Sequence, residues 1–255
     1  MNQPPTVHLY PIAGLPLVRP GDDLAALLLA GLDRAGLAAA DGDVLVVAHK
    51  VVSKAEGRLA SLAGVRPSAE ACRLADLTGK DPRLVEVILG ESRAVLRAVP
   101  GVLIVETHLG FICANAGVDH SNVDADEDVV ALLPADPDAS AARLRATIAQ
   151  RTGASVAVIV NDSHGRPWRE GTVGVAVGSA GIAAVEDLRG RLDLFGRPLR
   201  ITTVGLVDEL AAAASLVMGQ AAEGVPAVLV RGAGYPQAGP GARSVLRDAA
   251  HDLFR

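Results

Sequence analysis

The chain has 255 residues, half of them hydrophobic, a mean hydropathy of +0.32 and a formal net charge of −5. A chain of this size and composition can bury a large core, which predicts a folded protein of one large or two small domains. The negative charge and the 2% aromatic content argue against nucleic acid as a partner, because a basic surface and stacking rings are both lacking.

No apolar run approaches the roughly 20 residues of a membrane helix, and the amino-terminal residues lack a signal-peptide pattern. We therefore predict a cytoplasmic protein that does not interact with membranes. The two cysteines, Cys72 and Cys113, are far apart and have no neighbours at metal-ligand spacing. We expect both to be small buried apolar residues, which excludes a disulfide framework and a zinc site.

The first half of the chain predicts strands and helices in alternation. A short strand and a Gly/Pro-rich loop precede a helix that Asp22 or Asp23 can cap. Residues 43–53 predict an interior strand, because apolar side chains fill both of its faces. Two helices are then expected, over residues 69–79 and, after Asp81 and Pro82, over residues 83–96. A β-hairpin that turns at residues 108–110 follows.

The second half predicts a helix that Asp138 or Ser140 caps and that ends at Gly153. A buried strand follows and stops at Asn161, where polar residues begin. Tight backbone packing and ligand contact explain the glycines of residues 171–190 equally well. A small-residue helix from Asp208 precedes a last core strand, residues 227–230. This mixture of helices and strands predicts an α+β protein with largely antiparallel sheets.

Three polar groups are candidates for chemistry. Asp162 and Ser163, followed by Arg166 and Arg169, suit a hard cation bound to phosphate, although on this stretch alone a turn cap is the favoured explanation of the first two. Lysine occurs only at positions 50, 54 and 80, so the first two hint at a phosphate contact, with chance placement as the alternative. A polar loop, residues 115–122, is the third group, and its loop position alone can explain its composition.

Five segments, taken together and in this order over about residues 11–232, resemble the γ-glutamyl ligase family of deazaflavin coenzyme F420 biosynthesis. They are GLPLVRPGDD, DGDVLVVAHKVVSKAEGR, NAGVDHSNVD, VNDSHGRPWREGTVGVAVGSAG and VDELAAAASLVMGQAAEGVPAVLVRG. The resemblance implies a GTP-dependent ligase that uses Mg²⁺ or Mn²⁺, with K⁺ as a further candidate. It implies that L-glutamate is joined to the lactate carboxylate of coenzyme F420-0 and that γ-linked glutamates follow. It also implies a family-specific α+β fold, a homodimer, and a catalytic unit over residues 1–232 with a tail or linker over 233–255.

The resemblance assigns roles residue by residue. It implies a catalytic group of Asp119, Asp162 and Lys54, and metal ligands at Asp119, Asp162, Ser163 and Gln220. The residues implied to bind nucleotide are Leu15, Pro16, Leu17, Val18, His49, Lys50, Lys54, Asn122, Met218, Gly219, Gln220, Ala221, Ala222, Glu223, Gly224 and Val225. His108, His120 and His164 are expected to be loop histidines.

This sequence departs from the family pattern at two positions. Asn161 replaces a common threonine, and Gln220 stands where a metal-binding carboxylate is often found. A neutral amide oxygen still ligates a hard cation but lacks the charge that would help to hold a second ion. A second metal is therefore expected to be weaker or to be held by Glu223.

Two other functions stay open on the sequence alone. One is a carboxylate-amine ligase for another acidic acceptor, because the motifs define the phosphate and metal half of the site better than the acceptor pocket. The other is a homologue that binds GTP without turning it over, for which Gln220 is the hint.

Overall fold

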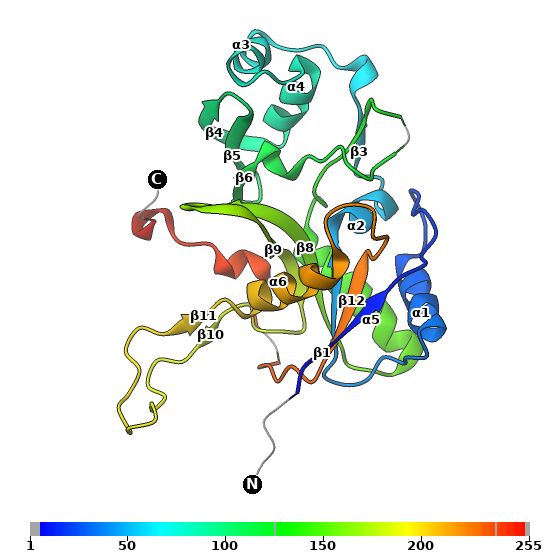
Figure 1. Ribbon diagram of the computed structural model, residues 1–255, viewed down its shortest axis with the longest axis vertical. Coiled ribbons are helices and arrows are strands. Elements are labelled where there is room, and N and C mark those ends of the chain that lie inside the picture. Colours follow the sequence, from blue (N-terminus) through cyan, green and yellow to red (C-terminus); the bar gives the residue numbers. More distant parts are fainter. Residues whose placement is uncertain (1–5, 125, 238, 253–255) are drawn as a thin grey trace.

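A five-stranded mixed sheet runs through the centre of the molecule (Figure 1). The structure is a computed structural model that describes residues 6–124, 126–237 and 239–252. Only β2 and β8 pair in parallel, and the other neighbouring strands are antiparallel. In spatial order the strands are β1 (His8–Ile12), β12 (Ala227–Arg231), β2 (Val44–Ala48), β8 (Ala157–Arg166) and β9 (Arg169–Ala180).

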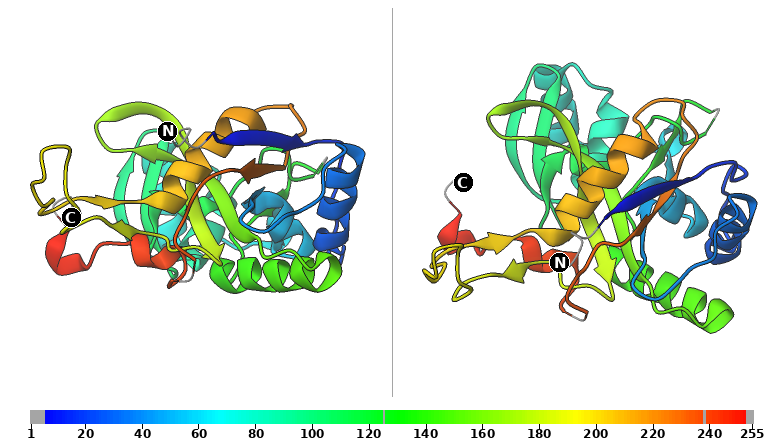
Figure 2. Two further views of the ribbon diagram at one scale, coloured as in Figure 1. Left: turned by 90° about the horizontal axis from the view of Figure 1, so that it is seen from below. Right: turned by 60° about the horizontal axis from the view of Figure 1, so that its bottom comes forward.

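Both faces of this sheet are covered, which explains why its central strands are apolar throughout. Leu45 and Val47 point into a core shared with α1 (Leu24–Arg34) and α5 (Pro137–Thr152). The alternate residue Val46 points into a second core, formed with α6 (Leu206–Met218). Figure 2 shows α6 crossing one face of the sheet and α5 lying on the other.

Helix ends follow local capping chemistry, with one correction. Asp23 accepts a hydrogen bond from the Ala26 amide and caps α1, as predicted. The cap of α5 is Asp136, followed by Pro137 in the first turn, so the prediction of Asp138 or Ser140 was wrong. The helix ends at left-handed Gly153 as expected.

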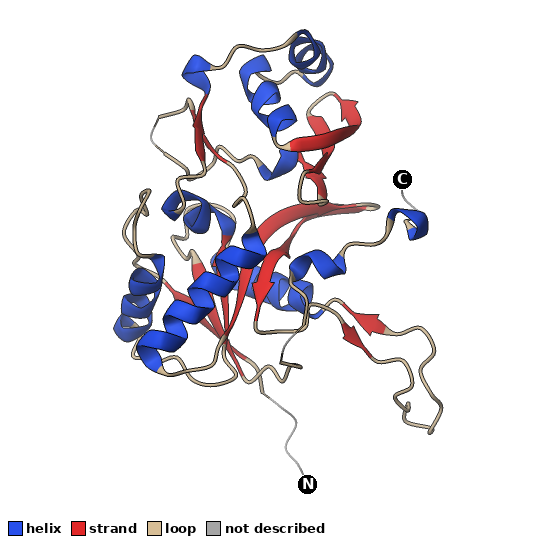
Figure 3. Ribbon diagram, turned by 180° about the vertical axis from the view of Figure 1, so that it is seen from behind, coloured by secondary structure: helices blue, strands red, loops and turns tan. Residues whose placement is uncertain are grey.

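A second layer of structure stands beyond the end of the central sheet (Figures 1 and 3). It has its own apolar core and a three-stranded antiparallel sheet, and its predicted hairpin at residues 108–110 is confirmed. A two-stranded sheet of β3 (Leu59–Ser61) and β7 (Val129–Ala131) lies between the layers. The other elements of this layer are α3 (Ala69–Thr78), α4 (Pro82–Gly90), β4 (Ser92–Val99), β5 (Val102–Thr107) and β6 (Ile112–Ala114).

Three predicted elements have different bounds in the structure. The helix expected over residues 83–96 ends at Gly90, because the following residues pair with β5 and tertiary pairing overrides their helix propensity. The strand expected over 43–53 ends at Ala48 and continues as α2 (His49–Ala55). The strand expected to stop at Asn161 runs on through β8 into a hairpin with β9.

Of the two explanations for the glycines, close packing is confirmed at the contact between α6 and β9. A side chain at Gly174 would collide with the Ser215 hydroxyl and the Ala211 carbonyl, and one at Gly178 would collide with the backbone of Pro137. The glycines therefore let two helices approach β9 from opposite faces.

The cysteine prediction is half confirmed. Cys113 on β6 is buried, whereas Cys72 on α3 is exposed. Cys72 is on the solvent face of α3, while Ala71 and Leu74 fill the core face, so helical periodicity decides its exposure.

A thin arm of residues 186–204 projects from the body of the molecule (Figure 2). It contains the short pair β10 (Glu186–Asp187) and β11 (Thr203–Val204).

In the tail, Ala242 is fully buried in the second core. The boundary predicted at residue 232 stays a prediction, and the outermost residues of both predicted units, 1–5 and 253–255, lie outside the described part of the chain. No helix among the described residues is long and apolar enough to span a membrane.

Candidate functional site

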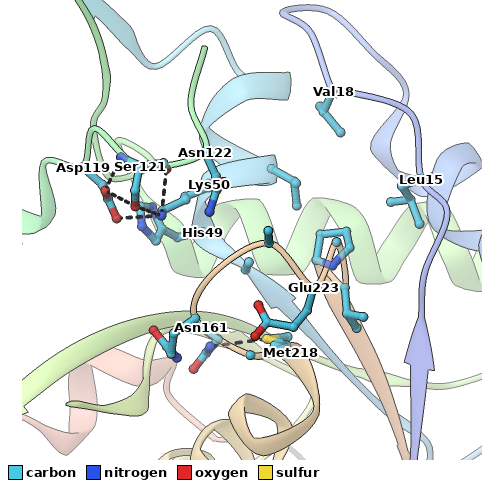
Figure 4. Close-up of a pocket in the computed structure, with 18 of the residues that line it drawn as sticks. Leu15, Val18, His49, Lys50, Asp119, Ser121, Asn122, Asn161, Met218 and Glu223 are labelled. Carbon is cyan, nitrogen blue, oxygen red and sulfur yellow. Dashed lines mark hydrogen bonds and ion pairs between the residues drawn. The ribbon is translucent and has the colours of Figure 1, made fainter. Parts of the chain in front are cut away.

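A cavity of about 450 Å³ opens between the end of the central sheet and four other chain segments (Figure 4). Leu15 and Val18 come from the loop after β1, and Lys50 comes from α2. Asp119 comes from the polar loop, and Glu223 from the loop after α6. The segments that line the cavity are residues 15–18, 48–51 with Lys54, 119–122 without His120, 161–163 and 218–226.

The parallel pairing of β2 with β8 builds one side of this cavity. Ala48 lies opposite Asn161, so His49, where β2 gives way to α2, lies beside Asp162, the next residue of β8. His49 Nε2 is 3.3 Å from Asp162 Oδ1, and His164 Nε2 is 2.9 Å from Asp162 Oδ2. The Ser163 amide donates to Asp162 Oδ1 at 2.7 Å. Asp162 is thus a buried carboxylate surrounded by donors.

Two opposing effects act on the pKa of Asp162. Burial raises it, but the charges and hydrogen bonds of His49 and His164 outweigh burial and hold the pKa well below its usual value. His49 itself is only 2% exposed; its Nε2 faces Asp162, and its Nδ1 has no hydrogen-bond partner among the described residues. A buried ring nitrogen without a partner, in a residue that lines a cavity, favours a polar ligand.

The polar loop and α2 build the opposite side. Lys50 Nζ is 2.7 Å from Asp119 Oδ2 and donates to the hydroxyl and the carbonyl of Ser121, at 2.9 and 3.0 Å. The amide and hydroxyl of Ser121 in turn donate to Asp119 Oδ1, each at 2.8 Å. Burial raises the pKa of Asp119, but the hydrogen bond and charge of Lys50 outweigh it, so the pKa is lowered.

Asn122 joins the polar loop to two other walls. Its carbonyl accepts a hydrogen bond from Lys54 Nζ at 2.7 Å, and its side-chain amide donates to the Ala221 carbonyl at 2.8 Å. The residue has a φ of +58°, a left-handed conformation that asparagine tolerates better than most residues. Burial lowers the pKa of Lys54. The charge of Asp124 raises this pKa, and the charge of Lys50 lowers it.

The loop after α6 brings Gln220 to Ser163, whose hydroxyl donates to the Gln220 amide oxygen at 2.9 Å. Glu223 turns back on its own loop and accepts from the Ala221 amide at 2.8 Å. Hydrogen bonds from loop amides lower the pKa of Glu223, and its own backbone amide makes the largest contribution. Gly219 has a φ of +71°, and a side chain there would strike the Glu223 carboxylate, so the turn requires glycine.

The oxygens of this cavity fit a hard divalent cation only in part. Asp162, Ser163 and Gln220 all line the cavity and offer carboxylate, hydroxyl and amide oxygens, which are the donors that Mg²⁺ and Mn²⁺ accept. In the described ranges, however, no three His, Cys, Asp or Glu side chains are grouped to hold a metal ion by themselves. An ion here needs further oxygens from a bound ligand, as Mg²⁺ takes from nucleotide phosphates.

Every residue that the family resemblance assigns to the site lines this one cavity. Five further residues line the cavity but were given no role from the sequence. Two of them carried a usable signal: Asn161 adjoins the predicted ligand Asp162, and Ser121 lies in the polar loop. Arg166 and Arg169 do not line the cavity, and His164 lies on a strand instead of the expected loop. The missed residues are Ala48, Val51, Ser121, Asn161 and Pro226.

A concave site with two lysines, two aspartates and glycine-containing loops is typical of a protein that binds a phosphorylated small molecule. The comparisons with known proteins agree: the signature of the F420-0:Gamma-glutamyl ligase family matches residues 14–232, and the chain belongs to this family.

Similar curated proteins named Coenzyme F420:L-glutamate ligase occur in several archaea. The one from Methanothermobacter thermautotrophicus is 49% identical over 251 residues, 98% of this chain and 99% of that protein. The Methanopyrus kandleri protein is 49% identical over 256 residues, 98% of each chain. The Archaeoglobus fulgidus protein is 43% identical over 250 residues, 98% of this chain and 96% of that one.

Proposed function

We propose that this chain is a coenzyme F420-0:L-glutamate ligase that consumes GTP. It joins the amine of L-glutamate to the lactate carboxylate of F420-0 and then adds glutamates through the γ-carboxylate. The observation that carries this proposal is the convergence of all the residues assigned from the family resemblance on one cavity, together with relatives of nearly equal length that carry the ligase name.

The proposed reaction has two steps. A carboxylate oxygen of the acceptor attacks the γ-phosphorus of GTP, the bond to the β-phosphate oxygen breaks, and GDP leaves. The glutamate amine then attacks the acyl carbon, the bond to phosphate breaks, and a proton is released as the amide forms. The first step turns a poor electrophile into a reactive one, so the protein needs no nucleophile of its own.

Such phosphoryl transfer requires mainly positioning and charge neutralisation. Lys50 and Lys54 provide two ammonium groups on α2, where they are four residues apart and share a helix face. We assign both to the phosphates of the nucleotide. The loop after α6, residues 218–225, supplies backbone amides, and residues 15–18 give an apolar edge for the nucleotide.

Asp162, with Ser163 and Gln220, would hold a divalent cation on one side of the cavity, and Asp119 would hold one on the other. Such an ion supplies charge for the phosphate oxygens in the transition state. Potassium is proposed only on the family resemblance. Glu223 accepts a hydrogen bond from the Ala221 amide through one oxygen, so its other oxygen would be the one to contact a second ion.

Product formation tests the proposal against both alternatives. The protein is incubated with F420-0, L-glutamate, GTP and Mn²⁺, and the products are read by mass spectrometry. We expect F420-0 with one or more added glutamates, in step with GDP release. A protein that binds GTP but yields no glutamylated product contradicts the ligase assignment and favours the non-catalytic homologue. Glutamylation of a different acidic acceptor, with F420-0 untouched, favours the other alternative.

We also propose a homodimer, supported by the exposed arm of residues 186–204. Leu194 and Phe195 are 99% and 81% exposed, and Ile201 is 87% exposed. Apolar side chains gathered on a projecting segment favour contact with another protein surface. Light scattering after size-exclusion chromatography is expected to give a dimer for the wild type and a smaller species for Phe195→Asp. A dimer that survives this change excludes the arm as the interface.

A further inference from the structure

His164 contacts the proposed metal ligand Asp162 from outside the cavity. It lies two residues further along β8, and side chains two apart on a strand share one face. Its Nε2 is 2.9 Å from Asp162 Oδ2, and its side chain is only 14% exposed. It is not among the residues that line the cavity. It can therefore influence a ligand in the cavity only through Asp162.

The hydrogen-bonding capacity of the Asp162 carboxylate is almost filled by protein groups. A carboxylate has about four lone-pair directions, two on each oxygen. Oδ1 accepts from the Ser163 amide at 2.7 Å and has His49 Nε2 at 3.3 Å. Oδ2 accepts from His164, so one lone pair of Oδ2 remains for a ligand. Asp162 lines the cavity, so we take this lone pair as the one open to a ligand there.

Without His164, the carboxylate could rotate more freely. The terminal torsion of aspartate is broad and nearly two-fold, so it does not fix the oxygens by itself. Ser163 and His49 both act on Oδ1, which leaves Oδ2 without a protein donor once His164 is removed. Groups behind a ligating side chain orient it, and their loss typically weakens metal binding about 10- to 100-fold.

We propose that His164 is a positioning residue, which turns the Asp162 carboxylate so that one Oδ2 lone pair faces a divalent cation in the cavity. This inference rests on the proposed function, in which Asp162 holds metal. On α6, Asp208 is the other acidic group near this imidazole: burial raises the pKa of Asp208, and the His164 charge opposes the rise.

Two variants separate positioning from a structural role. His164→Met places an apolar side chain of similar length at this position and removes the hydrogen-bond donor. His164→Gln keeps an amide nitrogen that can reach the same oxygen. His8→Met, on the far edge strand β1, is the matched control for loss of a histidine.

Mn²⁺ binding in the presence of GDP is measured by electron paramagnetic resonance of free Mn²⁺, and thermal unfolding is measured without metal. We expect the Mn²⁺ dissociation constant to rise about 10- to 100-fold in His164→Met. It should stay within about threefold of the wild type in His164→Gln and His8→Met. If His164→Met fails to fold, His164→Asn replaces it, because its shorter amide cannot reach Oδ2.

Each outcome distinguishes the positioning role of His164 from one alternative. No Mn²⁺ binding by the wild type contradicts the proposed metal site itself. Binding by the wild type with equal binding by His164→Met overturns the positioning role and leaves the proposed function standing. Equal weakening in His164→Met and His164→Gln, in step with a lower unfolding temperature, assigns His164 to the fold.

Discussion

The two aspartates of the cavity are held in different ways. Asp162 lies within a strand of the central sheet, and its side chain is 10% exposed and surrounded by histidines and a backbone amide. Asp119 lies between loops and is paired with Ala131 of β7 by a single isolated bridge; its side chain is 33% exposed and paired with the flexible ammonium of Lys50. Asp162 thus lies inside continuous strand pairing, whereas Asp119 is held by one bridge, one lysine and local hydrogen bonds. We therefore expect the sheet side to be the more rigid and the loop side the more adjustable.

The largest expected effect comes from the rigid side. Asp162→Asn removes the charge from the proposed metal ligand and places an amide among three donors. We expect turnover to fall by about a thousandfold or more, because metal stabilisation of a transition state is worth several kcal/mol. Product formation measures the loss, and circular dichroism checks that the fold is intact. Retained activity would remove Asp162 from the metal site.

A smaller effect is expected from the adjustable side. Lys50→Met removes one ammonium from the proposed phosphate site, and a hydrogen bond to a charged group contributes roughly 1.5–3 kcal/mol. Nucleotide affinity, measured by calorimetry, should fall about 10- to 100-fold. Lys80→Met removes a lysine outside the cavity and is the control. Equal affinities of the two variants would exclude a phosphate role for Lys50.

The same substitution should change the acid stability of the protein. A carboxylate whose pKa is lowered by folding stabilises the protein above its unfolded pKa, and this contribution is lost as the pH falls through the folded pKa. Lys50 lowers the pKa of Asp119 against the effect of burial, so in Lys50→Met that pKa should rise. Unfolding temperatures measured between about pH 3 and 7 should then begin to fall at a higher pH in the variant. Identical pH profiles would mean that the ion pair contributes nothing in solution.

Gln220→Glu should have a modest effect of the opposite sign. The new carboxylate would adjoin Ser163, whose hydroxyl already contacts Gln220, and would add a charge for a hard cation. We expect Mn²⁺ to support turnover at concentrations lower by about three- to tenfold. An unchanged manganese titration would show that position 220 does not contact the ion.

The smallest effect concerns the two thiols. Burial, with a smaller effect of the Asp162 charge, raises the pKa of Cys113 to about 12, whereas Cys72 is exposed. A thiol reagent at about pH 8 should therefore modify Cys72 in the native protein and both cysteines after denaturation. Asp162→Asn should leave Cys113 slow, because burial is the larger cause. Rapid modification of Cys113 in the native protein would show that the packing around β6 opens readily.

The composition of the cavity could be predicted from the sequence, but its geometry could not. Asp162, Lys50 and Asn122 belong to short motifs that can be recognised in the sequence. The contact of His164 with Asp162 is not visible there, because it depends on β8 continuing past Asn161 as a strand. The apolar strands were identifiable from their composition, whereas β4 was not, since its pairing with β5 is decided by tertiary contacts.

The parallel contact between β2 and β8 also determines when the site can form. Val44 pairs with Ala157, so more than a third of the chain, including the whole second layer, lies between the two strands. Pairing of distant segments forms slowly compared with helices and hairpins. A refolding chain can thus regain helix signal before Asp162 meets His49. The return of nucleotide binding during refolding should then follow the return of helix signal and mark the closing of the sheet.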